Sequence, residues 1–186
     1  MQRPLIAAAA ILALASCGSE PSTSETRTAD EVIAEASKLD APRPGQYQTT
    51  AKLVEFSIPG IPGHQAEQMK SMMGKMQAEA SSYCLTKEEA EKGFEEQIRK
   101  MARGEGEMDC KFARFDVDGG KLDAQLTCTG PQGMTSDMTL DGTTGAEASA
   151  MRMVMVQKAA IIPGGEMRME MKMNSKRVGE CPASGT

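Results

Sequence analysis

The chain has 186 residues, with 26 acidic and 21 basic side chains and a net charge of −5 at neutral pH. This length fits one domain with a hydrophobic core. Nucleic acid is excluded as a partner, because binding to phosphates needs a cluster of basic side chains and the sequence shows none. There is no tryptophan, and only two tyrosines and four phenylalanines, so other side chains must fill the core.

The first residues have the pattern of an export signal. Arg3 precedes an apolar run, Leu5–Ser16, which is long enough for a signal-peptide core and too short to span a bilayer as a helix. The run ends in Leu14-Ala15-Ser16-Cys17, which resembles the lipobox of bacterial lipoproteins, where the cysteine is acylated and becomes the first mature residue. We predict a lipoprotein signal peptide over residues 1–16 and lipidation at Cys17. The alternatives are an ordinary secretory peptide or an uncleaved anchor.

Lipidation would decide where the protein lies. Several acyl chains on Cys17 make a stable membrane anchor, because each buried methylene group contributes about 0.8 kcal/mol and a single chain binds only marginally. Gly18 follows the cysteine, and the absence of aspartate there favours the outer membrane in the enterobacterial sorting pattern. We expect a cell-envelope lipoprotein that faces the periplasm, with the outer membrane favoured over the inner one.

A polar segment precedes the predicted domain. Residues 17–41 are rich in Ser, Thr and Glu and predict a flexible tether. Within it, the segment ADEVIAEASKL (29–39) is compatible with a short helix. We place a single domain at residues 42–182, after the tether, and a C-terminal tail at residues 183–186.

The first half of the domain predicts one strand followed by two helices. Residues 45–58 are rich in aromatic and β-branched side chains, which is typical of a strand. Residues 64–80 predict an amphipathic helix with a methionine stripe at helical spacings, formed by Met69, Met72, Met73 and Met76. Thr86 and Glu89 match a capping box at the start of the second helix, which we expect to end near Gly104.

Residues 108–130 predict a β-hairpin, for which two registers compete. A two-residue turn at Gly119-Gly120 puts Phe115 and Val117 on the face of the apolar residues that follow. A three-residue loop instead places Cys110 directly opposite Cys128. A glycine bulge at the turn would reconcile the two registers, and the sequence does not decide between them.

Three further segments have strand patterns, at residues 133–142, 147–158 and 165–179. The predicted fold class is therefore α+β. We expect an antiparallel sheet of about six strands, covered by two amphipathic helices that are inserted after the first strand.

Apart from Cys17, the chain has four cysteines: Cys84, Cys110, Cys128 and Cys181. In an oxidising compartment this even number predicts two disulfides, whereas in the cytosol it would suggest a metal site. No pair has C-x-x-C spacing. The nearly symmetric placement of Cys110 and Cys128 about the hairpin turn favours their pairing, which leaves Cys84 to pair with Cys181.

Methionine occupies every second position of two predicted strands, at residues 151–155 and 167–173. Because successive side chains of a strand point to opposite faces, each row shares one face. An odd number of residues in the connecting loop would put both rows on the same side of the sheet, where the methionine stripe of helix 64–80 would cover them. We interpret the rows as core packing, since methionine is long and adaptable. A loosely packed cavity for an apolar ligand is an intermediate possibility.

The alternative interpretation of the methionines is a copper(I) site, because copper(I) prefers soft thioether ligands. Thioethers that share one ion must come within roughly 4 Å of each other, given metal–sulfur bonds of about 2.3 Å. Neighbours along one strand start about 7 Å apart, so only methionines on adjacent elements converge easily. The candidate ligands are Met153, Met155, Met169, Met171 and Met173.

No other group of residues indicates catalysis. His64 is the only histidine, and its place beside a glycine at a helix start is more typical of a surface or capping residue than of a catalytic triad. Glu88, Glu89 and Glu91 are expected in the first turn of a helix, where they favour its dipole. We expect no enzymatic activity and no cofactor.

Several short motifs resemble one known family. They are Pro44-Gly45-Gln46-Tyr47, Cys84-Leu85-Thr86, Cys110, Cys128-Thr129-Gly130 and the closing Arg177-Val178-Gly179-Glu180-Cys181-Pro182. In their order and spacing they resemble the bacterial domain-of-unknown-function family 3617, over roughly residues 42–182. Members often have tryptophan where Tyr47 stands. The resemblance implies a secreted or lipid-anchored, cysteine-stapled domain and supplies no active site.

The sequence thus predicts an envelope lipoprotein that is a non-enzymatic binding or structural module. Its expected partners are the membrane, through the lipid anchor, and an unidentified protein or apolar ligand. The alternative is a methionine-rich periplasmic protein that binds copper(I) or buffers redox conditions.

Overall fold

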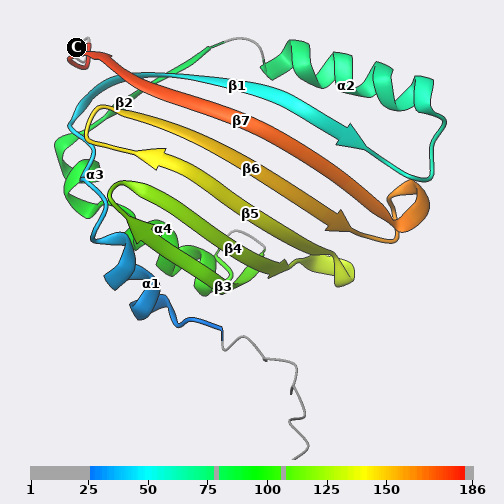
Figure 1. Ribbon diagram of the computed structural model, residues 1–186, viewed down its shortest axis with the longest axis horizontal. Coiled ribbons are helices and arrows are strands. Elements are labelled where there is room, and N and C mark those ends of the chain that lie inside the picture. Colours follow the sequence, from blue (N-terminus) through cyan, green and yellow to red (C-terminus); the bar gives the residue numbers. More distant parts are fainter. Residues whose placement is uncertain (1–25, 78–79, 106–107, 183–186) are drawn as a thin grey trace, which may run out of the picture.

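The computed structural model describes residues 26–77, 80–105 and 108–182. Within these ranges, seven strands form one antiparallel sheet in the order β2-β1-β7-β6-β5-β4-β3 (Figure 1). The strands are β1 (Gly45–Ser57), β2 (Ser81–Leu85), β3 (Asp109–Asp118), β4 (Lys121–Thr129), β5 (Thr135–Thr144), β6 (Ala148–Lys158) and β7 (Glu166–Gly179). The helices are α1 (Ala29–Ala36), α2 (Gly63–Gln77), α3 (Lys87–Lys92) and α4 (Glu95–Ala102), with short 3-10 turns at Pro131–Gly133 and Pro163–Gly165. The predicted α+β class is confirmed.

The strand order follows the path of the chain. Strands β3 to β7 form a meander in which each strand pairs antiparallel with the next. The last of them, β7, pairs with β1, so the first and last long strands lie side by side. The sequence predicted about six strands, and the additional one is β2, which pairs with residues 45–49 at the start of β1 and forms one edge of the sheet.

The second predicted helix is divided into α3 and α4. The capping box predicted at its start is present, because the amide of Glu89 donates to Thr86 Oγ1 at 3.2 Å and the Glu89 carboxylate accepts from the amide of Thr86 at 2.9 Å. Gly93 ends α3 with a φ of 55°, in the left-handed region that favours glycine. The chain therefore changes direction before α4, and Phe94 occupies the junction.

The β3–β4 hairpin combines features of both predicted registers. A two-residue turn at Gly119-Gly120 pairs Asp118 with Lys121, and Cys110 nevertheless lies directly opposite Cys128. Both glycines have positive φ angles, of 54° and 77°, as a tight hairpin turn of this kind requires.

An extra residue in β3 makes the two pairings compatible. The register shifts between Phe112 and Arg114, so that Ala113 forms a β-bulge with no partner of its own on β4. A bulge does reconcile the two registers, but not at the turn glycines, where the sequence suggested that one could lie. The bulge lies inside the strand, where the register change leaves the glycine turn unaltered.

Both expected disulfides are present. Cys110–Cys128 joins the two strands of the hairpin, with Cα atoms 4.0 Å apart. Cys84–Cys181 joins β2 to the residues that follow β7, with Cα atoms 5.4 Å apart. Because β2 pairs only with β1, this second disulfide gives the edge strand a covalent connection to the end of the domain.

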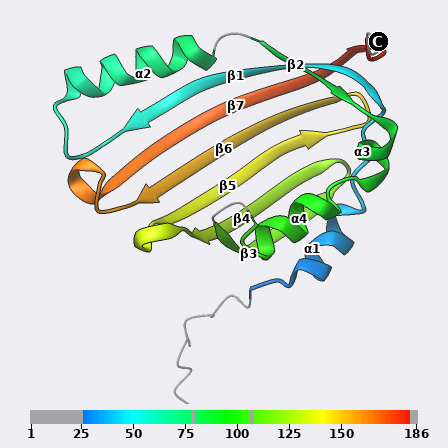
Figure 2. The same cartoon turned by 180° about the vertical axis from the view of Figure 1, so that it is seen from behind.

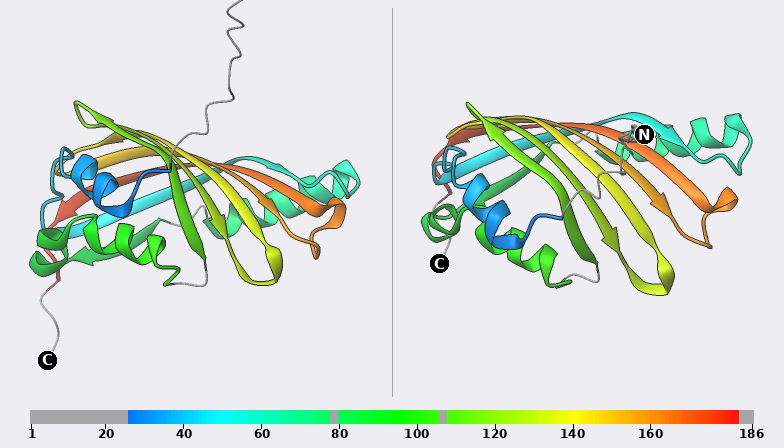
Figure 3. Two further views of the ribbon diagram at one scale, coloured as in Figure 1. Left: turned by 90° about the horizontal axis from the view of Figure 1, so that it is seen from below. Right: turned by 60° about the horizontal axis from the view of Figure 1, so that its bottom comes forward.

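The main hydrophobic core lies on the concave side of the curved sheet. Helices α1 and α4 cover this side over β3 and β4 (Figures 2 and 3). Val32 of α1, Ile98 of α4 and Phe112 of β3 are among its most deeply buried side chains. The short helix that we expected inside the tether thus packs against the sheet, and the folded core includes residues on the N-terminal side of Pro42.

A smaller core lies at the other end of the concave face. Leu53 and Phe56 of β1 and Ile58, which follows the strand, are buried there. Helix α2 runs beside β1 (Figure 1) and contributes Met73 to this cluster. The two clusters leave the middle of the concave face, over β5, β6 and β7, to a different set of side chains.

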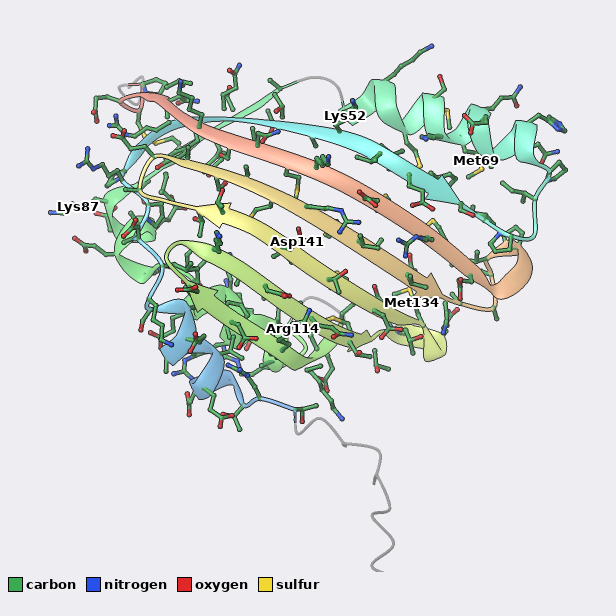
Figure 4. The ribbon with its side chains drawn as sticks, in the orientation of Figure 1. Lys52, Met69, Lys87, Arg114, Met134 and Asp141 are labelled. Carbon is green, nitrogen blue, oxygen red and sulfur yellow. A yellow bond between two sulfur atoms is a disulfide. The ribbon has the colours of Figure 1, made fainter. Side chains whose placement is uncertain are left out.

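The convex face is polar and carries several ion pairs. Arg152 contacts Glu170 at 2.8 Å on β7 and Asp141 at 3.2 Å on β5, and the hydrogen bond with Glu170 is the main cause of the raised pKa of Arg152. Figure 4 shows Lys52, Arg114 and Asp141 on this face, opposite α1 and α4. Such a charge-paired surface is typical of a face in water, which leaves the concave side for function.

Candidate ligand-binding site on the concave face

Both methionine rows lie on the concave face and are directly paired across β6 and β7. The pairs are Met151–Met173, Met153–Met171 and Met155–Met169. Residues 159–165 separate the last paired positions, Lys158 and Glu166, so the connecting segment has an odd number of residues. The condition that the sequence set for a shared face is therefore met.

The methionines of these rows are half-buried. Met151 packs against the main core, and Met167, Met169 and Met171 pack against the smaller one, so the rows border the two cores without being fully enclosed. The methionine stripe of α2 does not cover them, because α2 lies beside the edge of β1 rather than over β6. Met69 and Met72 of this stripe are 37% and 61% exposed, while Met73 packs against the smaller core, as Met169 and Met171 do. The side chain of Met76 lies outside the described part. The rows therefore form a wall that solvent reaches.

A cavity of about 640 Å³ lies between the concave face and α3–α4. The sheet contributes one wall, including Leu122, Leu140 and Met151, and the helices contribute Ile98 and Met101. The methionine row of β6 thus begins in this cavity and continues along the concave face. The volume is within the range of about 300–1,000 Å³ that is typical of small-molecule sites.

A pair of tyrosines from β1 and β2 lines the cavity. Tyr47 is buried, and its hydroxyl lies 2.8 Å from the carbonyl oxygen of Arg43, to which it donates. Burial raises the pKa of Tyr47, so the ring remains neutral over the physiological range. Tyr83 of β2 stacks on Tyr47 with ring centroids 5.5 Å apart. Together they present an aromatic surface to the cavity.

The charged group in the cavity lining is Glu89. Its carboxylate accepts hydrogen bonds from the amide and the hydroxyl of Thr86. These bonds, chiefly the one from the backbone amide, lower the pKa of Glu89. Because this carboxylate caps α3, the lining offers apolar contact rather than a charge for a ligand to pair with.

Two aromatic side chains mark the open side of the cavity. Tyr83 and Phe94 both line it and are 46% and 39% exposed. Phe94 stands at the junction of α3 and α4, where Gly93 lets the chain change direction. Exposed aromatic rings at the edge of an apolar cavity are typical of a ligand entrance.

The polar residues considered for catalysis do not converge. His64 is exposed near the start of α2, and Glu88, Glu89 and Glu91 lie on α3. Over residues 26–77, 80–105 and 108–182, no three His, Cys, Asp or Glu side chains are arranged to hold a metal ion. Helices in the same ranges are too short or too polar to cross a bilayer.

Sequence reasoning missed several residues of the cavity. Tyr83 belongs to a short, exposed strand without apolar alternation, so no periodic signal marked it. Leu140 lies in a predicted strand, and its pairing with Met153 would have been visible from a correct register of β5 and β6. Cys17, the predicted signal peptide at residues 1–16 and the tail at residues 183–186 lie outside the described residues.

Comparisons with known proteins assign a family but no activity. The model of the family described as "Protein of unknown function (DUF3617)" matches residues 42–181, which confirms the resemblance seen in the short motifs. No curated protein and no solved structure matches the chain.

Proposed function

Since the chain belongs to the DUF3617 family, whose function is unknown, we propose a function from its structure. The protein is a non-enzymatic module of the cell envelope that binds an apolar ligand in the cavity of the concave face. The observation that carries this proposal is the cavity of about 640 Å³ between the sheet and α3–α4.

The lining supports an apolar ligand rather than a charged one. Its walls are mainly aliphatic, aromatic and thioether side chains, with the uncharged polar side chains of Gln97, Thr144, Ser149 and Ser175 among them. Its carboxylate, that of Glu89, is engaged in capping α3. A methionine side chain has three rotatable bonds, so it can adjust its conformation to ligands of different shapes. This adaptability suits a flexible hydrocarbon ligand, which has no fixed shape to match.

The cellular location belongs partly to the same proposal. Two disulfides are typical of an extracytoplasmic protein. We further propose that Cys17 is acylated and anchors the domain to a membrane, facing the periplasm and preferably at the outer membrane. Intact-mass analysis of the membrane-extracted protein tests this step: added acyl mass at Cys17 supports it, and an unmodified cysteine contradicts it.

Ligand binding is tested with a neutral fluorescent probe. The chain from Gly18 to Thr186, with its disulfides formed, is titrated with N-phenyl-1-naphthylamine, which fluoresces in apolar surroundings. We expect a saturable rise in fluorescence that long-chain alcohols, which are uncharged, reverse by competition, and recovery of those alcohols chemically unchanged. A linear, non-saturable rise would contradict binding, and conversion of the alcohols would contradict a non-enzymatic role.

A further inference from the structure

We propose that Met138, Met155 and Met169 form a copper(I) site on the concave face. These residues lie directly opposite one another on three adjacent strands, since Met138 of β5 pairs with Met155 of β6, which pairs with Met169 of β7. They form an unbroken row of thioethers across the sheet. None of them lines the apolar cavity, so this site is independent of the proposed ligand site.

The row of Met138, Met155 and Met169 differs from the other two methionine pairs of β6 and β7 because it has a third methionine on β5. The next row along the strands contains Met153 and Met171, but Leu140 occupies its third position. The row after that contains Met151 and Met173, with Gly142 in the third position. Three thioethers side by side thus occur only at Met138–Met155–Met169 in this part of the sheet.

The spacing of the row allows three sulfur atoms to share one ion. Neighbouring strands lie about 4.7–4.9 Å apart, and sulfur ligands of one ion lie roughly 4 Å apart at metal–sulfur distances of about 2.3 Å. On the concave side of a curved sheet (Figure 3), side chains converge as they leave the backbone. Met138 and Met169 lie two strand spacings apart, roughly 9.5 Å, and pack against the main and the smaller core respectively. Binding of one ion therefore requires both side chains to turn toward Met155, which their three rotatable bonds permit.

The surroundings favour a soft, singly charged ion. Phe56 on β1 pairs with Met169, and Leu126 on β4 pairs with Met138, and both of these apolar side chains are buried. A low-dielectric setting penalises a doubly charged ion much more than a singly charged one. Thioethers select copper(I) among the common metal ions, whereas zinc requires thiolate, imidazole or carboxylate ligands.

A copper(I) ion can reach the three methionines because their side chains are only half-buried. Met138, Met155 and Met169 are neither exposed nor fully buried, so an ion reaches the sulfur atoms from the concave side without unfolding of the sheet. A fourth ligand is available from the neighbouring row, where Met153 and Met171 are paired.

The test is a titration of the full-length, disulfide-bonded protein with copper(I) under anaerobic conditions, in competition with the chelator bicinchoninate. We expect a single copper(I) ion per chain, held more tightly than micromolar. The triple variant Met138→Leu/Met155→Leu/Met169→Leu should bind at least about 100-fold more weakly. Methionine-to-leucine changes nearly conserve volume and usually cost less than about 1.5 kcal/mol, and thermal melting checks that the variant is folded.

A matched control uses methionines of the same chain. Met69→Leu/Met72→Leu changes exposed residues of α2 and should leave copper(I) affinity unchanged. Equal affinity of the triple variant and the wild type, or no binding tighter than micromolar, would overturn the proposal. X-ray absorption of the wild-type complex gives a second criterion that needs no variant: a first shell of sulfur alone supports the site, and nitrogen or oxygen ligands contradict it. Failure of either test leaves the cavity proposal intact.

Discussion

Met153 and Met171 lie directly opposite each other on β6 and β7, and both are half-buried. The relationship extends to the neighbouring pairs, so that methionine forms the middle of the concave face. The main core lies at one side of this surface and the smaller core at the other. The methionines therefore serve as an adaptable apolar wall, in keeping with an open binding surface.

The placement of the two faces can be tested on adjacent residues of β7. Met171 packs near Leu53 on the concave face, whereas Lys172 is exposed on the convex face. Met171→Lys should lower the free energy of unfolding by about 2 kcal/mol, because it places a charge on an apolar surface. Lys172→Met should stay within about 0.5 kcal/mol of wild type. Denaturant unfolding measures both, and equal effects would show that the faces are assigned wrongly.

The bulge at Ala113 makes a prediction about disulfide formation. Deleting Ala113 should preserve Cys110–Cys128, because the flanking residues Phe112 and Arg114 already pair with consecutive positions of β4. Inserting one alanine after Ala113 should abolish the disulfide, since a shift of one residue turns Cys110 to the other face. Alkylation and mass spectrometry count the free thiols. Loss of the disulfide on deletion would mean that the bulge does not set this register.

The disulfide of the edge strand should contribute strongly to stability. Cys84 and Cys181 are 97 residues apart, and the chain-entropy model gives about 4.7 kcal/mol for a loop of this size. Cys84→Ala/Cys181→Ala should lower the free energy of unfolding by about this amount. It should also weaken probe binding, because β2 supplies Tyr83 and Leu85 to the cavity.

The hairpin disulfide is the matched control for this change. Cys110 and Cys128 are 18 residues apart, which corresponds to about 3 kcal/mol. Removing them should lower stability while the β2 wall of the cavity stays in place. An unchanged free energy of unfolding in the Cys84→Ala/Cys181→Ala variant would contradict the assigned role of that disulfide.

Acid should destabilise the helix caps. The pKa values of Glu31 and Glu89 are lowered, chiefly by hydrogen bonds from the backbone amides of Thr28 and Thr86. A carboxylate with a lower pKa in the folded state stabilises the fold above its unfolded-state pKa, and this contribution is lost as the pH falls through the folded-state value.

Stability should therefore decline once the pH falls below the ordinary glutamate pKa of about 4.3. Glu31→Gln/Glu89→Gln should show a smaller decline, because neither side chain then titrates. Denaturant midpoints across this pH range provide the measurement. A decline as steep as that of wild type would show that the caps do not carry the pH dependence.

Local signals explain what the sequence could predict. The glycine turn of the hairpin, the alternation along β6 and β7 and the capping box at Thr86 each depend on residues close together in the chain. The positions of Cys110 and Cys128 about the turn also favoured the pairing found. The position of the bulge was missed because Ala113 differs in no visible way from an ordinary strand residue.

The cavity depends on tertiary arrangement and was harder to foresee. The apolar spacing of Phe94 and Ile98 predicted one continuous helix, but Gly93 divides it and leaves Phe94 at the cavity entrance. The methionine stripe of α2 predicted a cover for the sheet. The position of α2 beside β1 depends on where the chain leaves that strand. Helical periodicity predicts which face of a helix is apolar, but not where the helix lies relative to the sheet.

The proposal that the concave cavity binds an apolar ligand is tested most directly on two adjacent residues of β6. Ser149 lines the cavity, whereas Ala150 is exposed on the convex face. Ser149→Phe should fill the cavity and weaken binding of N-phenyl-1-naphthylamine by at least about tenfold, a loss of about 1.4 kcal/mol, while Ala150→Phe should leave it unchanged. Equal affinities of the two variants and the wild type would contradict ligand binding in this cavity.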